Sequence, residues 1–176
     1  GGSGDFAGDR RLSIREQLIQ AKQLVNRKHT GNSYIAYFQA YTNTYAPIDY
    51  LEKIFTEAIS ESDIKVLSIA TRPDCLSPEI LDLLFRLNQR KPVWVELGLQ
   101  TIHETSAKFI RRGYTLDVFE KAVYDLEKIG VSVVVHTILY LPYETEDMMM
   151  NTISYLNKLP INGIKLQLLH ILKDTE

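Results

Sequence analysis

Short apolar runs alternate with longer amphipathic segments along the whole 176-residue chain, and this alternation constrains the fold more than any other feature. Alternating strand and helix patterns are typical of parallel α/β architectures, in which a helix crosses between neighbouring strands. The pattern predicts strands at residues 33–41, 64–71, 92–100, 131–141 and 164–172. Right-handed crossovers place the carboxyl ends of such strands at one edge, where binding sites of these folds lie.

Helix-start and helix-stop signals support the same division of the chain. Ser13 and Glu16 form a capping-box pattern, Ser77 precedes Pro78 at a second helix start, and Gly130 ends a later helix. The predicted helices cover residues 14–28, 47–60, 78–90, 104–112, 116–129 and 146–159. The chain shows no repeat or internal linker, so we expect one domain over residues 1–176.

The composition excludes several classes of protein. A formal net charge of -2 provides no overall basic footprint for nucleic acid, although a local basic patch remains compatible with it. No run approaches the roughly 20 apolar residues of a membrane span, and we expect a cytoplasmic protein with no membrane partner. The single cysteine, Cys75, excludes an internal disulfide, and one thiolate cannot hold an iron–sulfur cluster. We therefore expect no metal ligands in this sequence.

Polar side chains gather near the carboxyl ends of strands that should otherwise be apolar. In the third predicted strand, Glu96, Gly98 and Gln100 alternate with valine and leucine, so they share the face opposite the helices. A buried polar group left without a partner costs about 1–3 kcal/mol, so several converging groups indicate a polar ligand site. The further candidates are Gln39, Thr42, Asn43, Thr71, Arg72, Arg112, His136 and His170.

Most of these candidates also have a structural alternative. Glu96 could pair with Arg72 or Arg112 in an ion pair that only stabilises the fold. His136 could be a hydrogen-bonded core histidine, and the amide of Gln100 suits a backbone cap as well as a ligand. The residue pattern by itself therefore establishes an α/β domain with a polar site at the strand carboxyl edge.

Three segments together resemble a family of bacterial radical S-adenosylmethionine (SAM) proteins related to the catalytic subunit of Elongator. They are YFQAYTNTY at residues 37–45, ATRPD at residues 70–74 and WVELGLQT at residues 94–101. The resemblance covers essentially the whole chain, including the glycine-rich start, which looks like the segment after the family's cluster loop. It implies an α/β fold, a partial (β/α)6 TIM-like barrel of parallel strands. The first strand and the three-cysteine loop would lie upstream, so the sequence is expected to be a fragment of the radical SAM core domain.

The resemblance also implies where SAM would bind. Gln39, Thr42 and Asn43 correspond to the segment that approaches the methionyl amino group. Thr71 and Arg72 follow the next strand and are expected to line the same cavity.

The later strands supply the remaining implied contacts. Glu96 and Gln100 sit where the family contacts the SAM ribose, and Arg112 looks like the arginine that pairs with the SAM carboxylate. A guanidinium fork suits a carboxylate well. His136 and His170 are candidates for contact with SAM or substrate across the cavity.

The activity implied for the intact protein is radical chemistry. A [4Fe–4S] cluster held by three cysteines would cleave SAM after one-electron reduction, by a donor such as flavodoxin or ferredoxin, to give a 5′-deoxyadenosyl radical that abstracts hydrogen. Relatives point to tRNA wobble uridine as the substrate. The fragment alone would be inactive because it lacks the cluster cysteines.

One departure and two competing functions stay open. Tyr140 and Tyr143 stand where the family's turn usually has glycines, and this could change how adenine is placed. A cluster-free barrel lyase would need a catalytic lysine, for which Lys165 is the strand candidate. A non-catalytic module that binds SAM or a nucleotide is the other alternative.

Overall fold

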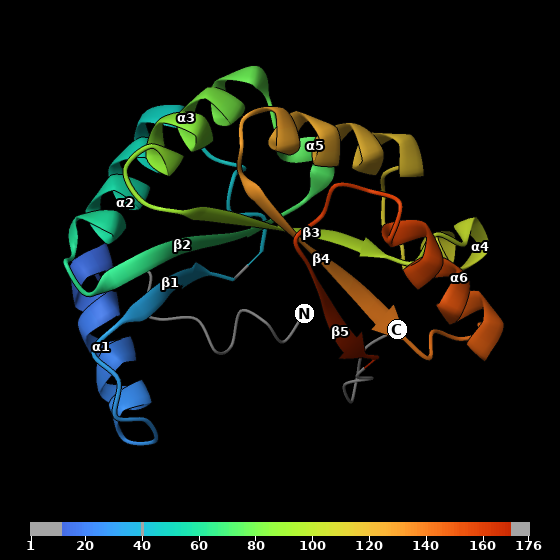
Figure 1. Ribbon diagram of the computed structural model, residues 1–176, viewed down its shortest axis with the longest axis horizontal. Helices are drawn as coiled ribbons and strands as arrows, with labels where there is room; N and C mark the ends of the chain where they lie inside the picture. The colour runs from blue at the N-terminus through green and yellow to red at the C-terminus, as the bar shows by residue number, and fades with distance from the viewer. Residues whose placement is uncertain (1–11, 40, 170–176) are drawn as a thin grey trace.

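The computed structural model of the chain describes residues 12–39 and 41–169, which form one curved parallel sheet with its helices (Figure 1). The strands pair in sequence order, and every neighbouring pair is parallel. They are β1 (Tyr34–Phe38), β2 (Ile64–Thr71), β3 (Val93–Gln100), β4 (Ser132–Leu139) and β5 (Gly163–Leu168). This architecture confirms the predicted partial barrel of parallel strands.

Helices cover the convex face of the sheet. Figure 1 shows α2 (Ile48–Ser60), α3 (Pro78–Asn88) and α5 (Leu116–Lys128) along the outside of the strands. The short helix α4 (Glu104–Phe109) and helix α6 (Glu146–Leu156) lie together on the right, and α1 (Ile14–Asn26) packs beside α2. None of the described helices is long and apolar enough to cross a membrane.

The helix starts confirm the predicted caps at Ser13 and Ser77. Ser13 and Glu16 form both bonds of a capping box at α1. Ser77 and Thr145 accept hydrogen bonds from backbone N–H groups in the first turns of α3 and α6. Thr115 occupies the N-cap position of α5, but its hydroxyl makes no such bond. Local sequence therefore determines where these helices begin.

The core lies between the convex face of the sheet and the helices. Leu97 and Leu99 of β3 are completely buried and belong to one cluster with Phe55 of α2 and Phe119 of α5. Burial of each such side chain contributes about 1.5–3 kcal/mol to folding. The alternating polar residues of β3 are therefore directed to the concave face, as the sequence predicts.

Several predicted elements end earlier in the structure, and three of these ends lie one to three residues before a residue with positive φ. The strand predicted to reach residue 41 ends at Phe38, before Tyr41 at φ 62°. The strand predicted to reach residue 141 ends at Leu139, and the helix predicted to reach residue 112 ends at Phe109. A left-handed residue cannot continue a strand or a right-handed helix, so the longer boundaries are wrong.

The early end of β1 is fixed by a side chain. Asn43 Nδ2 donates to the carbonyl oxygens of Phe38 and Ala70 at 2.9 Å each, which ties the following loop to two strands. Gln39 and Tyr41 consequently lie beyond the strand that contains Tyr37. β5 also ends early, at Leu168, and residues 170–172 of the predicted strand lie outside the described residues.

The fold predicts a contrast between two leucines in strands. Replacing the fully buried Leu97 by alanine should lower the free energy of unfolding by about 2–5 kcal/mol, because it leaves a cavity in the core. Leu166→Ala is the matched control, since that side chain on β5 is 57% exposed and should change stability by less than about 0.5 kcal/mol. Urea unfolding measures both, and equal losses would contradict the assignment of the core.

Candidate functional site

Each of the five strands contributes one polar side chain to a connected group on the concave face. We name this group the concave network, and its members are Tyr37, Ser68, Glu96, His136 and Lys165. Glu96 is its centre: Oε1 accepts from Ser68 Oγ at 2.7 Å, and Oε2 accepts from Tyr37 Oη at 2.9 Å. Oε2 also lies 2.5 Å from His136 Nε2 and 3.3 Å from Lys165 Nζ.

These donors hold Glu96 in its ionised form. Burial by itself raises the pKa of the Glu96 carboxyl group, but the hydrogen bonds from His136, Ser68 and Tyr37 and the charge of Lys165 outweigh burial and lower the pKa to about 2. An ionised carboxylate only accepts hydrogen bonds, so His136 Nε2 must carry the proton between them. The network is therefore an anion surrounded by donors.

Lys165 is held as a cation by the same contacts. Burial alone lowers the pKa of the Lys165 ammonium group, but its hydrogen bond to Tyr37 at 3.0 Å and the charge of Glu96 outweigh that effect and raise the pKa. The ammonium group also lies 4.6 Å from the centre of the Tyr37 ring. A protonated amine is not a nucleophile, so this arrangement does not suit the lysine-dependent lyase alternative.

The predicted arginine partners of Glu96 are wrong, because neither arginine reaches it and its ion pair is with Lys165. Arg72 forms a two-pronged ion pair with Asp74, at 2.9 Å and 2.7 Å. Arg112 faces Glu104, whose Oε2 lies 3.5 Å from Arg112 Nη2.

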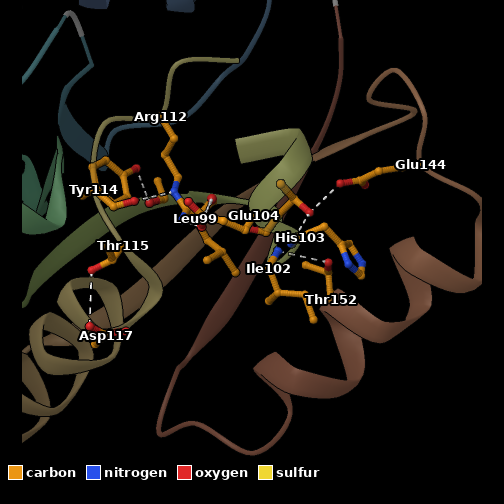
Figure 2. Close-up of polar contacts among 12 residues, drawn as sticks. Leu99, Ile102, His103, Glu104, Arg112, Tyr114, Thr115, Asp117, Glu144 and Thr152 are labelled. Carbon is orange, nitrogen blue, oxygen red and sulfur yellow. Dashed lines mark hydrogen bonds and ion pairs between the residues drawn. The ribbon is translucent and has the colours of Figure 1, made fainter. Parts of the chain in front are cut away.

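Tyr114 joins the two arginines at the carboxyl edge of β3. Its ring contacts the guanidinium groups of both Arg72 and Arg112, whose central carbons are 5.0 Å and 5.3 Å from the ring centre. Its hydroxyl donates to the Gly98 carbonyl at 2.6 Å (Figure 2). Burial raises the pKa of the Tyr114 phenol to about 12, so the hydroxyl remains a donor at neutral pH.

Arg112 uses most of its donors on the backbone. Nη1 donates to the carbonyls of Leu99 and Thr101, at 3.3 Å and 2.7 Å, and Nε donates to the Tyr114 carbonyl at 3.0 Å (Figure 2). Nη2 is buried and has no hydrogen-bond partner. Arg112 therefore holds the end of β3 in place and keeps one nitrogen available beside Glu104.

Gln100 presents an unsatisfied acceptor at the end of β3. Its backbone has φ 69°, the pairing with β4 shifts by one residue between Gly98 and Gln100, and its Oε1 is buried without a partner. Gly98 makes room for this arrangement, since a Cβ there would lie 3.0 Å from both Gln100 Nε2 and Tyr114 Oη. A buried acceptor of this kind is costly unless a ligand or water satisfies it.

The remaining predicted residues lie in or beside the loops after β1 and β2. Gln39 is exposed, Thr42 is half-buried, and Asn43 bonds to the backbone as described above. The hydroxyls of Thr71 and Thr44 lie 2.6 Å apart. His170 lies outside the described residues. The structure thus brings Glu96 to His136, and Arg72 to Arg112, in two separate groups.

The sequence interpretation missed Ser68, Tyr114 and a brace between β3 and α6. Ser68 carried a usable signal, because it interrupts the apolar run of β2. Tyr114 carried none, since its role depends on a loop that returns to β3. In the brace, Thr101 Oγ1 donates to Glu144 at 2.5 Å, and His103 Nε2 lies 2.8 Å from the Met148 carbonyl oxygen (Glu144 and His103 are labelled in Figure 2).

Strained backbone is concentrated around the same edge. The described residues other than glycine with positive φ are Tyr41, Gln100, Arg111, Tyr140 and Tyr143. All of them end a strand or lie in the segments that follow β1, β3 and β4. Such conformations cost about 1–3 kcal/mol each, persist where the surrounding structure enforces them, and cluster at functional sites. The carboxyl edge is therefore the candidate functional region.

The concave network predicts a pH-dependent contribution to stability. The Glu96 pKa of about 2 lies below the ordinary 4.5, so its contribution is complete above 4.5 and is lost as the pH falls towards 2. Glu96→Gln should lower the free energy of unfolding at neutral pH, on the order of 3 kcal/mol, and flatten its decline in acid. Urea unfolding across this range measures both, with the exposed Glu127→Gln as the control. Identical acid profiles for wild type and Glu96→Gln would contradict the assignment.

Known proteins resemble this chain over nearly all of its length. The model of the radical SAM superfamily matches residues 4–156. The uncharacterized protein YtqA of Bacillus subtilis is 45% identical over 174 residues, which cover 99% of this chain and 54% of YtqA. Protein YhcC of Escherichia coli K12 is 38% identical over 162 residues, covering 92% of this chain and 52% of YhcC. The chain thus spans about half the length of these relatives.

Solved structures share the fold at low sequence identity. Elp3 of the archaeon Methanocaldococcus infernus, with an N-terminal deletion, superposes with a TM-score of 0.73 at 19% identity, over 92% of this chain and 42% of Elp3. Coproporphyrinogen III oxidase from Escherichia coli, a radical SAM enzyme, gives 0.63 at 16% identity, over 74% of this chain and 30% of the oxidase. Because the family match covers most of the sequence and the fold agrees with it, the chain belongs to the radical SAM superfamily.

Proposed function

We propose that residues 1–176 are the larger part of the core domain of an enzyme that binds SAM on the concave face of this sheet. The observation that carries the proposal is the buried, unpartnered Oε1 of Gln100 at the carboxyl end of β3. A hydroxyl of the SAM ribose would satisfy it. The superfamily uses SAM with a [4Fe–4S] cluster, and the two together supply one-electron reductive cleavage of SAM.

The cluster ligands are proposed to lie outside this sequence. Cys75 is the single cysteine, and burial raises the pKa of its thiol, which disfavours the thiolate that a cluster requires. The described residues also contain no group of three or more histidine, cysteine, aspartate or glutamate side chains suited to a metal ion. These residues do not fit the cluster, so this chain's own role is to bind and orient SAM.

The candidate residues divide this task. Glu96 already accepts from four donors, so its proposed role is to fix Tyr37, His136 and Lys165 on the concave face next to the ribose. Arg112 could bind the SAM carboxylate only through Nη2, where that carboxylate would replace Glu104.

The end of β2 and the loops after β1 and β2 are proposed to complete the SAM site. Gln39, Thr42 and Asn43 are proposed to approach the methionyl amino group, and Thr71 and Arg72 to line the cavity.

We further propose that the intact enzyme acts on the wobble uridine of tRNA in the cytoplasm, with flavodoxin or ferredoxin as electron donor. The resemblance of residues 37–45, 70–74 and 94–101 to relatives of the Elongator catalytic subunit supports this substrate. Nucleoside analysis of tRNA from a deletion strain tests it. Accumulation of an unmodified or incompletely modified wobble uridine is expected, and an unchanged profile would refute this substrate.

SAM binding is the direct test of the proposed site. In a protein extended upstream to include the three cysteines and reconstituted anaerobically, we expect iron–sulfur absorption and formation of 5′-deoxyadenosine. Gln100→Leu should weaken SAM binding about tenfold in calorimetry, the equivalent of one lost hydrogen bond. Gln23→Leu on the exposed side of α1 is the matched control and should bind normally.

A second variant tests whether the position of the Gln100 side chain matters, without removing its amide group. Gly98→Ala keeps Gln100 but places a Cβ 3.0 Å from its amide nitrogen, so it should also weaken SAM binding. Normal SAM affinity in both Gln100→Leu and Gly98→Ala would refute the site. If the natural protein has no three-cysteine motif upstream of this sequence, the proposal that it is a SAM-cleaving enzyme is refuted.

A further inference from the structure

Three exposed aromatic side chains lie near the end of α4 and in the loop after β4, and the proposed SAM chemistry uses none of them for catalysis. Tyr143 is 84% exposed, Tyr140 is 63% exposed and Phe109 is 55% exposed. Phe109 and Tyr143 touch edge to face, with ring centres 5.9 Å apart. Aromatic rings gain little from folding when they remain in water, so this cluster points to a partner.

The backbone strengthens this inference. Tyr140 has φ 57° and Tyr143 has φ 71°, a region that bulky side chains rarely adopt and that glycine adopts freely. At both positions tyrosine costs conformational energy and recovers little by burial. A tyrosine at such a position lowers the stability of the fold. Contact of its ring with a partner outside the chain would explain why tyrosine is present there.

The charges beside the rings indicate which kind of partner. Lys108 precedes Phe109 and Arg111 follows it by two residues, and both are exposed, whereas the exposed Glu146 and Asp147 lie beyond Tyr143. They line a cavity of about 390 Å³ together with Arg112 and the amino-terminal end of α5. Glu104 is the only carboxylate that lines this cavity. Basic groups next to exposed aromatic rings suit a polyanion whose flat bases can stack, which is single-stranded nucleic acid.

The rings stand on a rigid support. The brace between Thr101 and Glu144, at 2.5 Å, connects the segment before α4 to the residue that follows Tyr143. His103 and the Met148 carbonyl make a second link between the start of α4 and α6. A fixed spacing between the rings lowers the entropy lost on binding.

We propose that Phe109, Tyr140 and Tyr143 form a stacking surface for unpaired nucleotides of an RNA, with Lys108 and Arg111 contacting the neighbouring phosphates. This inference rests on the proposed RNA substrate and identifies where its single-stranded part would dock. It places RNA recognition on the loop after β4, beside the proposed SAM site.

The test measures binding of a fluorescein-labelled RNA stem-loop to the purified chain by fluorescence anisotropy. Tyr143→Gly should weaken binding roughly 5- to 150-fold, as expected for loss of one stacked base. The same variant should melt at an equal or higher temperature, because glycine relieves the positive φ. Tyr143→Phe should retain binding. Tyr50→Ala, which removes an exposed tyrosine from α2 on the opposite side of Figure 1, should bind normally.

Salt dependence tests the phosphate contacts. Lys108→Gln should reduce the slope of log affinity against log salt by about 0.7, the value for one phosphate contact with a single strand. A blunt RNA duplex of equal length should bind more weakly than the stem-loop, because its bases cannot reach the rings.

Several results would overturn the stacking surface. Unchanged RNA affinity in Tyr143→Gly would do so, as would equal affinity for the duplex and the stem-loop. A wild-type dimer that dissociates in Tyr143→Gly would instead assign the surface to a second copy of the chain. No RNA binding by a chain whose extended form still binds SAM would refute the surface alone. If the extended wild-type protein does not bind SAM, the proposed function itself is refuted.

Discussion

The buried carboxylate of Glu96 is the interaction on which this structure depends. An isolated charge in a protein interior costs several kcal/mol, and Glu96 is only 9% exposed. Its donors come from all four other strands. Lys165 on β5 reaches Tyr37 on β1 at 3.0 Å, although three strands separate them in the sheet order. Only a strongly curved sheet brings these two side chains together, so curvature and charge stabilise each other.

The same curvature separates the face that stabilises the fold from the face that is proposed to bind a ligand. The convex face is apolar and holds the helices, whereas the concave face and the carboxyl edge hold the polar groups and the strained residues. Gly98 and Gln100 show how closely this edge is built, because a single methyl group at Gly98 would meet both the Gln100 amide and the Tyr114 hydroxyl. The strained residues thus lie where a ligand is proposed to bind, and the free energy gained by burying the core offsets the cost of that strain.

Much of the fold was accessible from local patterns. Ser13 with Glu16, and Ser77 before Pro78, mark helix starts because a side chain and the first turn lie within a few residues of each other. Leu97 and Glu96 fall on opposite faces because the strand repeat is two residues. The early ends of β1, β4 and α4 were not accessible in this way. Tyr41, Tyr140 and Arg111 adopt positive φ although their side chains do not favour that conformation.

The sequence by itself determined the order of strands and helices, the faces of β3 and a polar edge that contains Glu96, Gln100 and Arg112. Only the tertiary structure decided their partners. Glu96 joins His136 and Lys165 and not the arginines, Arg112 supports the backbone around Leu99, and Gln100 keeps an unsatisfied acceptor. The physical reason is the sequence separation of the interacting residues. Helix starts and strand faces depend on residues that are neighbours in the chain. Hydrogen-bond partners follow from how far a five-stranded sheet curves, and no short segment encodes that curvature.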